Sequence, residues 1–181
     1  MVFERLWQLI IAKENPATLT HSVRTAVAGM VSLLVASLFR LPETYWAAIS
    51  TLIVMQSSLG AALPVSVQRF AGTAVGAIFG GFVGTYLPGN VAAFGVALFA
   101  IGLLCAALKV ERSAYRYASI TLAIIMLVPR VANEWVVAMH RFLEVSIGIL
   151  VGLAVSAVWP ERIGEPAAKI DDPISVGEEG N

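Results

Sequence analysis

Two arginines at the edges of long apolar segments are the residues best suited to chemistry. Arg24 and Arg69 each lie in or beside a stretch that is otherwise uncharged. A guanidinium group keeps its charge and binds carboxylates through paired hydrogen bonds. Together the two arginines predict a binding site for an organic anion near the cytoplasmic face. The alternative for each is that its side chain extends to lipid phosphates at the membrane edge.

A glutamate in a later apolar segment has two interpretations. Glu144 follows Arg141 by three residues, so on a helix the two side chains are close enough to form an ion pair. A glutamate inside a membrane segment is also typical of a site that binds a coupling proton. Both interpretations stay open from the sequence.

A polar interruption predicts where a transport site lies. The segment that starts at Thr44 loses its apolar character at Gln56, Ser57 and Ser58, after a helical rise of only about 20 Å. A later segment, residues 114–128, is its counterpart and is cut short by Pro129. Short, interrupted segments at matching places in two halves are typical of transporters. We therefore expect Gln56, Ser57 and Ser58 to line the substrate site.

Other kinds of chemistry are excluded or left without a signal. His21 and His140 are far apart, Cys105 is the only cysteine, and no phosphate-binding loop or nucleophile elbow is present. We therefore predict no enzyme activity, no metal site and no cofactor. Twelve basic residues balance twelve acidic ones without a long basic run, which excludes nucleic acid as a partner.

The composition predicts a membrane protein. Hydrophobic residues make up 58% of the 181-residue chain and charged residues 13%, far from the soluble average. Because a span needs about 20 apolar helical residues, we expect an all-α, polytopic domain over residues 17–160. The six expected spans cover about residues 20–39, 44–56, 68–87, 91–108, 114–128 and 135–159.

The two ends of the chain differ from this domain. Residues 1–16 predict an amphipathic helix that lies in the membrane interface, or one that packs on the protein's own cytoplasmic face. Residues 161–181 are polar, acidic and rich in proline and glycine, which predicts a disordered tail.

The placement of charges and aromatic residues predicts the orientation. With six spans, nine lysines and arginines fall on the side of the termini and three on the other. This places both termini in the cytoplasm of a bacterial-type inner membrane. Tyr45 and Trp46 lie near a predicted span end, so they fit an interfacial aromatic belt, with stacking on a ligand as the alternative.

The two halves of the chain resemble each other. Residues 46–55 align with 117–126 at an offset of 71, and residues 69–84 align with 141–156 at an offset of 72. Each unit, about 20–87 and about 91–159, holds three spans, so the second must enter the membrane in the opposite sense. This predicts a 3+3 inverted repeat, with chance similarity between apolar segments as the alternative.

Glycines recur every fourth residue in two of the spans. The first set is Gly72, Gly76, Gly80 and Gly84, and the corresponding set in the second repeat is Gly148 and Gly152. Such stripes allow a neighbouring helix backbone to approach closely. They predict either a crossing that slides during transport or static tight packing.

Three blocks carry a resemblance to a known family. They are HSVRTAVAG, LPETYWAAISTLIVMQSSLGAAL and QRFAGTAVGAIFGG, in this order. They resemble the fusaric acid resistance and aromatic acid exporter family, a relative of the plant aluminium-activated malate transporters. The residues on its motif positions are Arg24, Tyr45, Trp46, Arg69, Gly72, Thr73 and Gly76.

The resemblance implies export of small organic anions, particularly aromatic carboxylates, by a six-span module. It also implies a homodimer with twelve spans, and the family is associated with a periplasmic adaptor for which these residues give no signal. The chain departs from longer members by lacking a large cytoplasmic domain. Alternatives are an anion channel of the same fold, a non-transporting scaffold subunit, and an intramembrane enzyme without a recognisable nucleophile.

Overall fold

The computed structural model describes residues 19–55, 59–128 and 132–160, and this part of the chain is all-helical, as predicted. The helices are α2 (Leu19–Leu38), α3 (Tyr45–Met55), α4 (Leu59–Tyr86), α5 (Val91–Ala107), α6 (Arg112–Leu127) and α7 (Glu134–Val158). The predicted N-terminal amphipathic helix, the polar residues Gln56, Ser57 and Ser58, and the tail lie outside the described residues.

Helix α4 starts earlier than the sequence predicts. It begins at Leu59, whereas the expected span opened at Gln68, and it contains Pro64 in its second turn. The apolar residues around Pro64 continue the helix, so the polar interruption is shorter than its composition indicates. As a result Arg69 is the eleventh residue of α4 and not part of its first turn.

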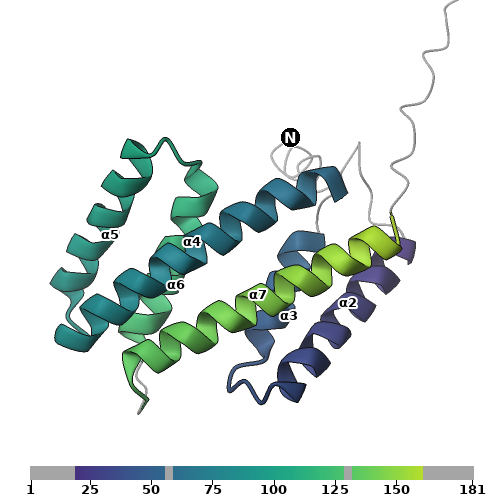
Figure 1. Ribbon diagram of the computed structural model, residues 1–181, viewed down its shortest axis with the longest axis horizontal. Helices are drawn as coiled ribbons and strands as arrows, with labels where there is room; N and C mark the ends of the chain where they lie inside the picture. The colour runs from purple at the N-terminus through teal and green to yellow at the C-terminus, as the bar shows by residue number, and fades with distance from the viewer. Residues whose placement is uncertain (1–18, 56–58, 129–131, 161–181) are drawn as a thin grey trace, which may run out of the picture.

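Two long helices cross the centre of the molecule. Figure 1 shows α4 and α7 packed side by side, with α5 and α6 at one end and α2 and α3 at the other. Helix α6 packs mainly on α4, and α3 packs mainly on α7. Each flanking pair therefore attaches to a different central helix.

The outer surface is apolar, as expected for contact with lipid. Large side chains such as Leu34, Phe99 and Val158 are exposed at 70%, 67% and 87%. The interior contacts are made largely by small residues, for example Ala28 and Ala118, which are fully buried. Exposed apolar patches of this extent are unusual in a soluble monomer. Three described helical segments, Leu19–Leu38, Ala62–Tyr86 and Glu134–Val158, are long and apolar enough to cross a membrane.

The turns after α2 and α5 have the same backbone geometry. Arg40 and Lys109 adopt positive φ angles of 54° and 53°, which are uncommon for residues other than glycine. In both turns the next residue's N–H closes the helix end: Leu41 donates to the carbonyl of Ala36, and Val110 to that of Cys105. The two helices thus end in the same way.

Candidate functional site

The two central helices approach their partners at glycines. A Cβ atom added to Gly76 of α4 would lie 2.4 Å from the carbonyl oxygen of Ala118 in α6. One added to Gly148 of α7 would lie 2.2 Å from the carbonyl oxygen of Ala47 in α3. Only a residue without a side chain permits backbones to come this close.

The other predicted glycines differ in how tightly they are enclosed. A Cβ atom on Gly72 would lie 2.3 Å from the carbonyl oxygen of Ala114, and one on Gly80 or Gly152 would lie 2.9 or 3.0 Å from an isoleucine or valine side chain. At Gly84 the nearest atom is the Cγ of Glu134, 3.2 Å away. The glycine stripe is therefore tight along most of α4 and looser at its end.

Arg69 is buried between α4, α3 and α6. Its side chain is 6% exposed, and its Nη2 donates a hydrogen bond to Ser50 Oγ at 3.0 Å. The guanidinium carbon lies 4.9 Å from the centre of the Tyr117 ring. The Nε atom is buried without a hydrogen-bond partner. Arg69 therefore keeps one donor unsatisfied in the interior.

Arg141 has a closely similar environment on the other central helix. It is 2% exposed, and its guanidinium carbon lies 3.3 Å from the ring centre of Trp46 in α3. Both Nε and Nη1 are buried without a hydrogen-bond partner. Each arginine thus stacks on an aromatic ring of the helix that packs against its own.

The two arginines lie on α4 and α7, which pack against each other. They are close enough to interact electrostatically. The adjacent residues Phe70 and Phe142 also meet, with their ring centres 4.9 Å apart. The residues that follow the two arginines in the chain therefore join α4 to α7, with Phe70 partly exposed.

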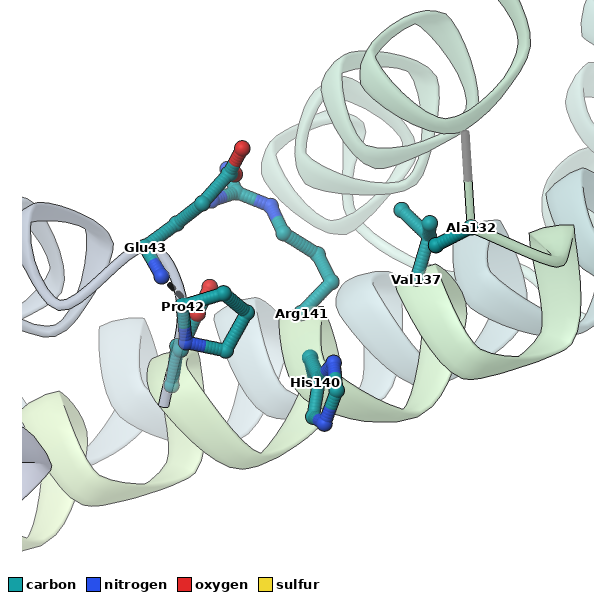
Figure 2. A pocket seen from close by; sticks show the side chains of 7 residues that line it. Pro42, Glu43, Ala132, Val137, His140 and Arg141 are labelled. Atoms are coloured by element: carbon teal, nitrogen blue, oxygen red, sulfur yellow. Dashed lines mark hydrogen bonds between the residues drawn. The ribbon is translucent and has the colours of Figure 1, made fainter. Parts of the chain in front are cut away.

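Two carboxylates lie next to Arg141. Glu43, in the turn before α3, donates its backbone N–H to Glu144 Oε1 at 3.0 Å, and its Oε2 accepts from Trp46 Nε1 at 3.0 Å. Both carboxylates interact electrostatically with Arg141. In Figure 2 the Arg141 side chain extends from α7 toward Glu43, whereas the His140 ring points away.

These groups line a cavity of about 110 Å³, together with Pro42, Ala132, Val137 and His140. The described residues include no group of three or more histidine, cysteine or acidic side chains arranged to hold a metal ion.

The residues predicted for the anion site are distributed differently. Arg24, which is 2% exposed, donates from Nη1 to the carbonyl oxygen of Trp159 at 3.0 Å, so it binds the C-terminal end of α7. Arg24 and Arg69 are thus held by different partners. Trp46 stacks on Arg141. Tyr45 is half exposed; its ring centre lies 5.3 Å from that of Trp46, and it also interacts electrostatically with Arg141.

Sequence reasoning did not include Arg141 or Tyr117 in the anion site. The signal was nevertheless present in the repeat alignment. The offset of 72 pairs Arg69 with Arg141, and the offset of 71 pairs Trp46 with Tyr117. Extending the role of each residue to its counterpart would have identified both pairs.

The arrangement is suited to bind an anion. Each buried charge costs on the order of 2.5–3.5 kcal/mol at the centre of a membrane helix, and two like charges close together add repulsion. Three guanidinium nitrogens without partners, Nε of Arg69 with Nε and Nη1 of Arg141, supply donors that a carboxylate group accepts well. A bound carboxylate would give these nitrogens hydrogen-bond acceptors.

Comparison with known proteins agrees with the resemblance found in the sequence. The fusaric acid resistance protein-like family matches residues 25–155. Inner membrane protein YeeA of Escherichia coli (strain K12) is 26% identical over 150 residues, which cover 80% of this chain and 42% of that protein. The chain thus spans less than half the length of this relative, and no solved structure matches it. Because the family matches most of the chain, and because three described helical segments are long and apolar enough to cross a membrane, the chain is a membrane protein that belongs to the fusaric acid resistance protein-like family.

Proposed function

We propose that this protein exports small organic anions, and that Arg69 and Arg141 bind the anion between α4 and α7. The observation that carries the proposal is the pair of buried arginines with hydrogen-bond donors left unsatisfied. A fixed site of this kind would exchange the hydration shell of a carboxylate for paired hydrogen bonds. Membership in a family whose description names an organic acid supports the same class of substrate.

Aromatic acids are the substrate class that fits the surroundings best. Trp46 and Tyr117 already lie on the two guanidinium groups. Aromatic rings next to a cationic site favour a ligand that has a planar apolar body and one charged end. We therefore propose aromatic carboxylates as the preferred ligands.

The proposed architecture is a 3+3 inverted repeat with six membrane spans. Equivalent residues make equivalent contacts: Gly76 meets Ala118 as Gly148 meets Ala47, at the offsets of 72 and 71 that align the halves. Only residues near a two-fold axis can meet their own counterparts, as Phe70 and Phe142 do. An axis in the membrane plane would put the arginine pair near the midplane, where such transporters bind their ligands.

The proposal also covers the orientation of the chain in the membrane and its protein partners. Both termini would lie in the cytoplasm of a bacterial-type inner membrane, because the positive charges predominate on that side. A homodimer and a periplasmic adaptor are also proposed, and they rest on the family resemblance.

A transport assay tests the proposal. Purified protein in liposomes should move labelled benzoate, and Arg69→Gln and Arg141→Gln should each reduce the rate about tenfold to a hundredfold, since a hydrogen bond to a charged group contributes about 1.5–3 kcal/mol. Arg112→Gln is the matched control, because Arg112 is exposed at the start of α6. Transport at the wild-type rate by a folded Arg69/Arg141 double variant would refute the role of the pair. Steady benzoate currents would instead favour an anion channel.

A further inference from the structure

The charges around Arg141 balance only when no ligand is bound. Its guanidinium group interacts with Glu144 on the same helix, with Glu43 and Tyr45 around the start of α3, and with Arg69 on α4. His140 also lines the adjacent cavity. Among these side chains the two arginines carry two positive charges and the two glutamates two negative ones. The four described groups therefore sum to zero before an anion enters.

An entering carboxylate would leave one uncompensated negative charge. A buried charge without a partner is costly, and a carboxyl group in such a position takes up a proton instead. We propose that Glu144 binds one proton for each monovalent anion that binds to Arg69 and Arg141. The inference rests on the proposed function, because it concerns proton binding at the same anion site.

Glu144 is the better acceptor of this proton because it is the more deeply buried carboxyl group. It is 1% exposed, whereas Glu43 is only partly buried. The proton comes from water and forms an O–H bond on the carboxylate, with no other bond broken in the protein. The cavity of about 110 Å³ that Glu144 lines is larger than the roughly 10–15 Å³ that one water molecule needs, so it has room for water beside this carboxyl group.

The proton site is confined to one half of the molecule. At the position equivalent to Glu144, 72 residues earlier, the first half has Gly72. A Cβ atom there would lie 2.3 Å from the carbonyl oxygen of Ala114, so this position has no space for a carboxylate. The two arginines are therefore alike in their aromatic partners and different in their acidic neighbours.

The test is proton uptake during anion binding by the purified full-length protein. Benzoate is titrated by calorimetry between about pH 6 and pH 8, where it stays ionised, in buffers of different ionisation enthalpy. We expect up to one proton per benzoate, and an affinity that rises up to about tenfold for each pH unit of acidification. Glu144→Gln keeps an oxygen to accept from the Glu43 N–H and should bind benzoate without proton uptake or pH dependence.

Each other outcome overturns a defined part of the reasoning. Glu134→Gln is the matched control at the start of the same helix and should behave like the wild type. Wild-type binding without proton uptake would refute the inference alone, and so would unchanged proton uptake in Glu144→Gln. Loss of uptake only in Glu43→Gln would refute the assignment to Glu144. If the wild type bound no benzoate at any pH, the proposed function itself would fail.

Discussion

Replacing Gly148 by alanine should push α7 and α3 apart at the point where they cross. The new Cβ atom would lie 2.2 Å from the carbonyl oxygen of Ala47 and 2.5 Å from the Cβ of Ser50. Ordinary contact begins near 3.4 Å, so the helices must move apart by roughly 1 Å. Overpacking of this kind costs about 1–3 kcal/mol. The movement would also weaken the 2.9 Å hydrogen bond from Thr51 Oγ1 to the Gly148 carbonyl, worth about 0.5–1.5 kcal/mol.

Alanine itself favours the helix by about 0.5–1 kcal/mol over glycine, which offsets part of this cost. The net loss of about 1–3 kcal/mol corresponds to a Tm lower by roughly 2–12 °C for a chain of this size. Thermal unfolding of the purified protein in detergent measures it. Gly95→Ala is the matched control, since nothing lies within 4 Å of the added Cβ in α5, and its Tm should be equal or slightly higher. A Gly148→Ala variant as stable as Gly95→Ala would refute the close crossing.

Three further predictions concern other contacts. Gly84→Ala should change the free energy of unfolding by less than about 1 kcal/mol in the same Tm assay, because the neighbouring Glu134 side chain can move. A loss of stability as large as that of Gly148→Ala would contradict this. Arg24→Gln should destabilise the protein by about 1.5–3 kcal/mol, because the hydrogen bond to the Trp159 carbonyl is lost, while benzoate affinity stays unchanged; weaker binding in folded protein would instead place Arg24 in the anion site. A double-mutant cycle with Phe70→Leu and Phe142→Leu should show a coupling energy of about 0.5–1.5 kcal/mol, and additive effects on unfolding would count against their contact.

The helical class and the membrane environment follow from composition and periodicity, because a long run without charge has few other stable solutions. The start of α4 does not follow from the sequence in this way. The polar residues before Leu59 predict an interruption, but the helix already begins at Leu59, among apolar residues. That difference moves Arg69 from the edge of a helix to its interior. The pairing of Arg24 with Arg69 rested on their expected edge positions, and the structure gives the two residues different partners.

The sequence by itself determined which residue types are available: arginines in or beside uncharged segments, glycines at every fourth position, and two halves that align at offsets of 71 and 72. These are properties of spacing along one helix, and spacing is readable from the chain. Only the tertiary structure decided that Arg69 and Arg141 come within electrostatic range of each other and that Glu43 and Glu144 lie beside Arg141. Such contacts join residues far apart in the chain. They depend on which helices cross and at what distance, and the sequence pattern of a single helix does not contain this information.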